Sequence, residues 1–90
     1  MLKPKPSNRF KKNYNLMEKC GYDMSLIDDA IEMLLQEKPL PVSYLDHPLQ
    51  GNWKGFRECH ILPDWLLIYK ADGKNLLLYL ERTGTHSDLF

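Results

Sequence analysis

Three histidines stand in the second half of this 90-residue chain, among other side chains that could act on a phosphodiester. His47 and His60 fall in the stretch DHPLQGNWKGFRECHILPDWLLIYK, and His86 falls in the tail ERTGTHSDLF. An imidazole can take up or release a proton near neutral pH, because its unperturbed pKa is about 6.5. Asp64 and Arg82 stand in the same two stretches. These residue types could together cleave RNA.

RNA can be cut by its own 2′-hydroxyl, which attacks the adjacent phosphorus. The step needs a general base for that hydroxyl, a general acid for the leaving 5′-oxygen, and positive charge beside the phosphorane. Histidines can serve as base or acid, and arginine can stabilise the charged transition state through paired hydrogen bonds. A carboxylate such as Asp64 can orient an imidazole or raise its pKa. The mechanism requires no metal.

Taken singly, each of these residues also has a plainer interpretation. His47 could be a surface hydrogen-bonding residue, and His60 could be a partly buried side chain near a strand end. Asp64 could be a turn residue, and Trp65 could belong to the core or its rim. Phe90 is harder to explain in this way, because a chain terminus usually frays unless it is docked. From spacing alone, a ribonuclease is therefore only modestly favoured.

A zinc site is a weaker alternative. Cys59, His60 and His47 offer sulfur and nitrogen ligands, but the chain has no CxxC or HxxxH spacing. It also has no glycine-rich phosphate loop and no nucleophile elbow. We therefore expect neither a metal nor another cofactor. Cys20 and Cys59, in a chain without a secretory signal, indicate reduced thiols of the cytoplasm.

The length and composition predict one soluble domain over residues 1–90. A chain of this size has room for about one sheet and two or three helices. No apolar run approaches the ~20 residues needed to cross a bilayer, so we expect no membrane partner. The net charge of +0 argues mildly against simple capture of nucleic acid. However, residues 1–12 carry five basic groups and no acid, so a nucleic-acid face could be assembled from the ends.

The first half of the chain predicts an edge strand and two helices. Lys3 and Lys5 alternate with Leu2, Pro4 and Pro6. This pattern suits an edge strand, because proline cannot donate a hydrogen bond within a sheet. Ser7 can cap a helix over about residues 8–20, and Gly21 suits its left-handed stop. An apolar stripe predicts a second helix over about residues 24–37, packed antiparallel to the first. Its start contains a possible capping box, formed by Ser25 and Asp28.

The second half predicts a sheet. Prolines mark residues 38–48 as a loop. WKGFRECHI is a plausible strand with Gly55 as a possible bulge, and WLLIYK and NLLLYLER are strands joined at ADG, a hairpin signal. The fold class is therefore α+β, a small antiparallel sheet with two N-terminal helices on one face. The other face is left for a site.

The two quoted stretches closely resemble the YafQ-type branch of the RelE/ParE superfamily of bacterial toxin–antitoxin modules. The resemblance covers nearly the whole chain and is far more specific in these stretches than a short motif. It implies a RelE-like fold, with a compact sheet and two helices packed on one face. One departure is the charge: toxins of this superfamily are usually clearly basic, whereas this chain has a pI of about 6.8.

The resemblance also implies an activity. It implies a ribosome-dependent mRNA endonuclease that acts in the ribosomal A site, inhibits translation, and leaves a 2′,3′-cyclic phosphate and a free 5′-hydroxyl. The family's active-site positions fall on His47, His60, Asp64, Trp65, Arg82, His86 and Phe90. In this set, Trp65 and Phe90 would contact RNA.

We assign the proton transfers within that resemblance as follows. His86 is the general acid, and His60 or His47, helped by Asp64, is the general base. Arg82 stabilises the phosphorane. The assignment of base and acid could be reversed, because residue types alone do not separate the two roles.

The resemblance implies partners as well. They are a cognate antitoxin that neutralises the toxin, the ribosome with its mRNA, and operator DNA reached only through the antitoxin. Two alternatives stay open. One is a ParE-like toxin that inhibits a topoisomerase without cutting RNA, against which the three histidines and Arg82 argue. The other is a degenerate toxin that serves only as a binding partner, which the near-neutral charge alone favours.

Overall fold

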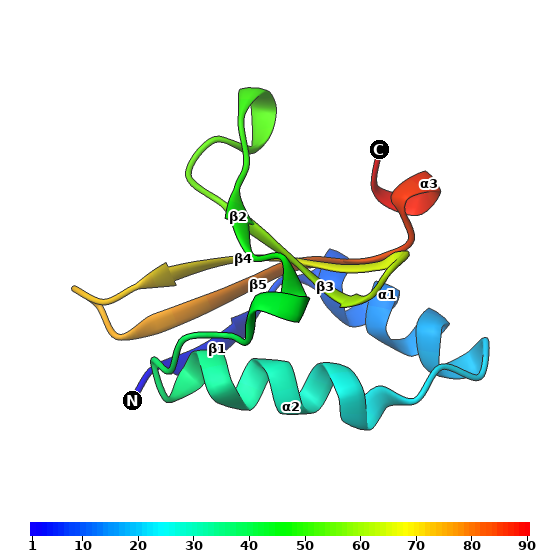
Figure 1. Cartoon of the computed structure of the whole chain (residues 1–90), viewed down its shortest axis with the longest axis horizontal. Coiled ribbons are helices and arrows are strands. Elements are labelled where there is room, and N and C mark those ends of the chain that lie inside the picture. The colour runs from blue at the N-terminus through cyan, green and yellow to red at the C-terminus, as the bar shows by residue number, and fades with distance from the viewer.

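The computed structural model describes all 90 residues as an α+β fold built on a five-stranded sheet (Figure 1). The spatial order of the strands is β1-β5-β4-β3-β2. The strands are β1 Lys3–Pro6, β2 His47–Pro48, β3 Arg57–Leu62, β4 Trp65–Asp72 and β5 Leu77–Gly84. The helices are α1 Asn8–Lys19, α2 Met24–Leu35 and the short α3 His86–Leu89. The predicted fold class is confirmed, with one addition: the edge strand β1 runs parallel to β5.

The first helix begins and ends where the sequence predicted. The Ser7 hydroxyl accepts a hydrogen bond from the backbone N–H of Phe10 at 3.0 Å, which satisfies one of the free donors of the first turn. Gly21 follows the helix with a φ of +89°, a conformation that costs glycine little because it has no Cβ. Phe10 and Met17 are buried on the side that faces the sheet.

The second helix begins at Met24, as predicted, but a different residue caps it. Asp23 is its N-cap, and its carboxylate accepts a hydrogen bond from the backbone N–H of Ser25 at 3.0 Å. The predicted capping box between Ser25 and Asp28 is therefore wrong. Asp28 instead accepts a hydrogen bond from the Tyr14 hydroxyl at 2.8 Å, which ties α2 to α1. Figure 1 shows α2 running back along the sheet after the chain reverses at the end of α1.

Both faces of the sheet are covered, but unequally. The larger cluster lies between the sheet and helices α1 and α2. Its largest members are Phe10, Met17, Ile27, Trp65, Leu67, Tyr69, Leu78 and Leu80. On the other face a small cluster forms around Leu66, Ile68 and Leu89, the last of these in α3. Leu49, Trp53 and Phe56 pack against this cluster and are partly buried. No helix of the chain is both long and apolar enough to span a bilayer.

The β4–β5 hairpin turns where ADG predicted, through a longer loop than a two-residue turn. One carboxylate oxygen of Asp72 accepts hydrogen bonds from the backbone N–H groups of Lys74 and Asn75, both at 3.1 Å. The loop residues are 73–76, and Leu76 takes the left-handed conformation with a φ of +58°. The Asp72 side chain, part of the predicted hairpin signal, thus stabilises the loop.

The predicted bulge at Gly55 is wrong, because Gly55 lies in the turn before β3 with a φ of +95°. A real irregularity lies in β5. Ile68 pairs with Arg82 while Tyr69 pairs with Leu80, so Glu81 is an extra residue. Since one extra residue reverses which side chains face which side, Leu80 lies in the helix-facing core and Arg82 emerges on the opposite face.

Candidate active site

The sheet register places four polar side chains on the face away from α1 and α2, those of His47, Glu58, His60 and Arg82. His47 in β2 pairs with Glu58 in β3, Glu58 pairs with Ile68 in β4, and Ile68 pairs with Arg82 in β5. Directly opposed residues of a sheet share a face. His60, two residues beyond Glu58 on the same strand, shares that face as well.

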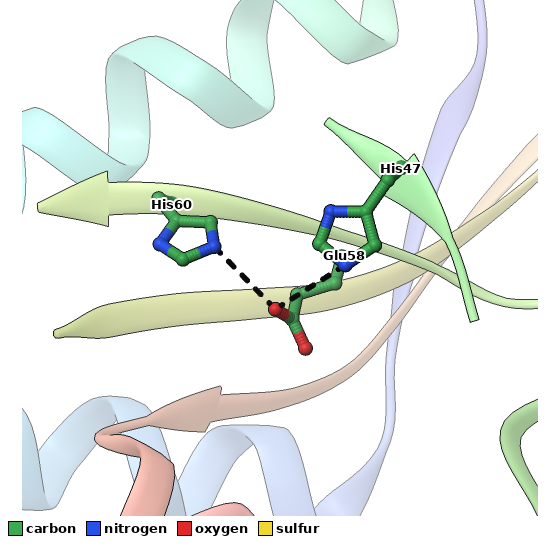
Figure 2. A group of neighbouring side chains, drawn as sticks. All are labelled: His47, Glu58 and His60. Atoms are coloured by element: carbon green, nitrogen blue, oxygen red, sulfur yellow. Dashed lines mark ion pairs between the residues drawn. The ribbon is translucent and has the colours of Figure 1, made fainter. Parts of the chain in front are cut away.

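Two of the histidines converge on one buried carboxylate (Figure 2). The Nε2 atoms of His47 and His60 lie 3.7 Å and 3.6 Å from the same Oε1 atom of Glu58. Glu58 is only 5% exposed. Glu58 was not predicted as a site residue, although one signal was available: it stands two residues before His60 in a predicted strand, which puts both on one face. Its carboxylate provides negative charge between the two imidazoles.

The backbone determines which nitrogen of each ring faces that carboxylate. Nδ1 of His47 lies 2.7 Å from the carbonyl oxygen of Leu45, and Nδ1 of His60 lies 3.3 Å from that of Pro63. A carbonyl oxygen can only accept, so we assign the hydrogen to Nδ1 in both rings. Leu45 has a φ of +49°, which is uncommon for a leucine and belongs to the loop that presents His47. In the neutral rings, Nε2 is then free to accept a proton.

The third histidine is held by a different carboxylate. Oδ1 of Asp64 accepts hydrogen bonds from Nδ1 of His86 at 2.7 Å and from the His86 backbone N–H at 3.1 Å. These hydrogen bonds lower the pKa of Asp64 below its ordinary value. Asp64 was expected to help His60 or His47, and that pairing is wrong, because their carboxylate is Glu58. The ring centroids of His60 and His86 are 5.9 Å apart, and those of His47 and His60 are 6.2 Å apart.

The C-terminal tail is folded back so that His86 reaches this row. Gly84 has a φ of +157°, and a Cβ at this position would lie 3.1 Å from Cβ of Asp88. The Thr85 side chain and the Asp88 carboxylate form a reciprocal capping box at the start of α3. Leu89 then docks on the small cluster of the open face. Glycine suits this position because the last residue of β5 passes so close to α3.

Arg82 lies on the open face but does not touch the histidines. Its Nε donates a hydrogen bond to the side-chain oxygen of Asn13 at 2.8 Å, and its Nη2 donates to the carbonyl oxygen of Asp88 at 3.4 Å. Burial, followed by the nearby positive charge of Arg9, lowers the pKa of Arg82. Two strand spacings, about 10 Å, separate its position from Glu58. Arg82 must extend toward the histidines to reach a phosphate bound there.

Of the two aromatic residues predicted to bind RNA, one is buried and the other is exposed. Trp65 is fully buried on the helix side, where its Nε1 donates to the Thr83 hydroxyl at 2.9 Å and its ring meets Tyr22 edge-on. The expectation that Trp65 contacts RNA is therefore wrong, because a ring without exposed surface cannot stack on a base; its core interpretation holds. Phe90 is 61% exposed at the end of the tail and is available for contact.

The possible zinc ligands in the structure differ from the three residues considered in the sequence. Cys59 is buried on the helix side, and burial raises the pKa of its thiol to about 12, so it cannot join His47 and His60. Glu58 takes its place: one ligand atom from each of His47, Glu58 and His60 lies within 4.8 Å of the others. Imidazole and carboxylate suit zinc or copper. The Nδ1 atoms of His47 and His60 contact backbone carbonyl oxygens, and contacts of this kind orient metal-binding histidines.

Comparisons with known proteins agree with this fold. They define a class, the bacterial toxins of type II toxin–antitoxin systems. A family model described as "Bacterial toxin of type II toxin-antitoxin system, YafQ" matches residues 2–90. The chain belongs to this YafQ family.

Individual relatives cover almost the whole chain. It is similar to the mRNA interferase toxin YafQ of Escherichia coli (strain K12), with 47% identity over 85 residues, 93% of this chain and 90% of that protein. The crystal structure of YafQ from E. coli strain BL21(DE3) has a TM-score of 0.93 and 43% identity, over 100% of this chain and 99% of that one.

Two further structures show what related toxins bind. The E. coli DinJ-YafQ complex contains a chain with 44% identity and a TM-score of 0.91, over 100% of this chain and 99% of that chain. A metal-bound toxin from Helicobacter pylori has 42% identity and a TM-score of 0.94, over the full length of both chains.

Proposed function

We propose that this toxin is an mRNA endoribonuclease that cuts messages in the A site of a translating ribosome and so inhibits translation. The observation that carries the proposal is the convergence of three histidines, each with its own polar partner, on one open face of the sheet. The E. coli relatives, which are named mRNA interferase toxins, support it. Cytoplasmic location follows from a substrate on the ribosome.

His47 or His60 acts as the general base for the 2′-hydroxyl. Both rings keep Nδ1 on a backbone carbonyl, so Nε2 is the atom that receives the proton. Glu58 lies beside both Nε2 atoms, where its negative charge stabilises the imidazolium that forms. Because His60 lies between the other two rings, it is the better placed to reach a phosphate shared with His86.

His86 acts as the general acid for the 5′-oxygen. Its Nδ1 contact with Asp64 fixes the orientation of the ring and leaves Nε2 free to donate a proton to the leaving oxygen. The ring is on a short tail and more than half of the side chain is exposed, so a substrate can reach it. Arg82 approaches the phosphorane from β5 and balances its charge, while Phe90 contacts a base near the cut.

The proton transfers and the charge balance are all supplied by side chains in this mechanism, and it needs no metal. The attack forms a bond between the 2′-oxygen and phosphorus while the bond to the 5′-oxygen breaks. The base takes the 2′-hydroxyl proton and the acid gives one to the leaving oxygen. The products are a 2′,3′-cyclic phosphate and a free 5′-hydroxyl. A cation held by His47, Glu58 and His60 would occupy the base and oppose the reaction.

A cognate antitoxin holds the toxin inactive, and the complex reaches operator DNA through the antitoxin. The DinJ-YafQ complex of E. coli supports an antitoxin partner. Neither alternative function gains support from the geometry. A topoisomerase-binding toxin has no need of three aligned imidazoles, and a degenerate toxin has no need of two carboxylates that hold them.

Primer extension on a translated message tests the proposal directly. Purified toxin is incubated with the message alone and with the message on programmed ribosomes. We expect cuts only with ribosomes, and downstream fragments whose 5′ ends accept phosphate from a polynucleotide kinase without prior phosphatase treatment. Cleavage of the naked message at the same positions and rate would contradict ribosome dependence. Absence of cleavage in both samples would contradict the nuclease itself.

A further inference from the structure

We propose that a groove beside Arg82 is a binding subsite for single-stranded RNA, in which Arg9 and Arg82 hold a backbone phosphate and Trp53 stacks on a base. The inference extends the proposed nuclease function, because it places RNA that lies beyond the cut. The groove has a volume of about 510 Å³. It is lined by Arg9, Asn52, Trp53, Phe56, Glu81, Arg82 and Leu89.

Two guanidinium groups enter the groove without a carboxylate partner. Neither Arg9 nor Arg82 takes part in any of the five ion pairs of the structure. Arg9 is close enough to lower the pKa of Arg82, after the larger effect of burial. Arg9 and Asn13 are four residues apart and share one side of α1, and Asn13 holds Arg82 by a 2.8 Å hydrogen bond. Two like charges held together in this way favour an anion between them.

Two aromatic side chains, Trp53 and Phe56, line the same groove as the two arginines. Trp53 is half-buried, and its ring meets Phe56 edge-to-face at 5.6 Å between centroids, with 89° between the ring planes. Both residues come from the connection between β2 and β3 and pack against the small cluster of the open face. Positive charge beside aromatic rings is the combination that binds single strands, because every base offers a face for stacking.

The groove also explains how a chain of net charge +0 can bind RNA. The basic side chain of Arg57 is neutralised by Asp46, with 3.2 Å between Nε and Oδ1. Arg9 is one of the five basic groups in residues 1–12, but its closeness to Arg82 depends on the fold. Glu81 is the one acidic side chain in the groove, so two arginines and one glutamate leave a local charge of +1. Glu81 therefore moderates the affinity for RNA.

Salt-dependent binding tests the subsite without reference to cleavage. A His86→Gln toxin is titrated into a short, labelled single-stranded RNA at about 50 to 200 mM salt, and the anisotropy is followed. Arg9→Gln is added to this background and compared with Lys19→Gln. Lys19 is exposed in the last turn of α1, so its loss removes the same charge about 15 Å away.

We expect Arg9→Gln to weaken binding and to reduce the slope of log K against log salt by about 0.7, the value for one phosphate contact on a single strand. Lys19→Gln should leave the slope unchanged, and Glu81→Gln should tighten binding. Equal slopes for the Arg9→Gln and Lys19→Gln variants would overturn the subsite. Failure of the His86→Gln parent to bind RNA at about 50 mM salt would also overturn it.

Tryptophan fluorescence tests the stacking contact separately. The chain has two tryptophans, and Trp65 has no exposed surface. We expect RNA to quench the fluorescence of the His86→Gln toxin and to leave it unchanged when Trp53→Phe is added, since only Trp65 then emits. Quenching that persists in the Trp53→Phe variant would overturn the stacking contact. Because no assay here measures cleavage, a failed nuclease and a failed subsite give different results.

Discussion

Asp64 holds His86 through two hydrogen bonds to one oxygen, from the ring Nδ1 at 2.7 Å and from the backbone N–H at 3.1 Å. The two residues are 22 positions apart, and Asp64 lies in the turn between β3 and β4. The contact therefore fixes the C-terminal tail to the same end of the sheet that carries His60. In the proposed mechanism, the orientation of the general acid therefore depends on Asp64.

Replacing Asp64 by asparagine should slow cleavage by about tenfold or more, because His86 loses the carboxylate that fixes the orientation of its ring and of its backbone. Since the pKa of Asp64 is lowered in the folded protein, its contribution to stability is present at neutral pH and lost as pH falls through that lowered value. Asp64→Asn should lose this part of the acid dependence.

Asp72→Asn is the matched control for that experiment. Asp72 is likewise an exposed carboxylate whose pKa is lowered by hydrogen bonds, there from Asn75, but it lies in the β4–β5 loop. Cleavage rates should be unchanged by Asp72→Asn. Equal rates for the Asp64→Asn and Asp72→Asn variants would show that Asp64 does not position the acid.

Replacing Glu58 by glutamine should reduce the maximal rate of cleavage by about tenfold or more. Glu58 lies beside Nε2 of both His47 and His60, where its negative charge would stabilise the positive charge that develops on the general base in the transition state. Glutamine keeps the volume of the side chain, so urea denaturation should show a folded protein. A folded Glu58→Gln toxin that cuts at the wild-type rate would contradict the role assigned to this carboxylate.

Added zinc or copper should inhibit cleavage, whereas a chelator should not. The three ligand atoms of His47, Glu58 and His60 lie within 4.8 Å of one another, and a bound cation would occupy the general base. Calorimetry should show one site for Zn²⁺ that is lost in the Glu58→Gln toxin. If dialysis against a chelator abolished cleavage and metal restored it, the metal-independent mechanism would be wrong.

The two cysteines should differ sharply in reactivity. Cys20 is exposed, whereas Cys59 is buried on the helix side with its pKa raised to about 12. A disulfide reagent at pH 8 should therefore modify one thiol in the native protein and two in denaturant, because the thiolate is the reacting form. In the native state, the Cys20→Ser variant should show no modified thiol. Rapid modification of that variant would contradict the packing of β3.

The elements that the sequence predicted well are those whose causes are local. Ser7 caps α1 through a neighbour three residues away, and Gly21 ends it through its own backbone conformation. The separation of a helix-covered face from an open face followed from placing both predicted helices on one side of the sheet. Asp23, by contrast, was overlooked as the cap of α2 because Ser25 offered a similar side chain two positions later.

The partners within the site could not be predicted in the same way. Glu58 meets His47 only because β2 pairs with β3, and Arg82 reaches the open face only because Glu81 is an extra residue in β5. Neither the pairing nor the bulge leaves a pattern in a single sequence. Trp65 was misplaced for a related reason, since the strand that contains it is apolar on both faces.

Single-turnover cleavage of a ribosome-bound message by the wild-type and His86→Gln toxins tests the central claim most directly. Glutamine can keep a hydrogen bond to Asp64 but cannot donate a proton to the leaving oxygen, so we expect the rate to fall by about 10²- to 10⁴-fold. Binding to the ribosome should be unchanged. A folded His86→Gln toxin that cuts the same message at the wild-type rate would contradict the acid–base mechanism.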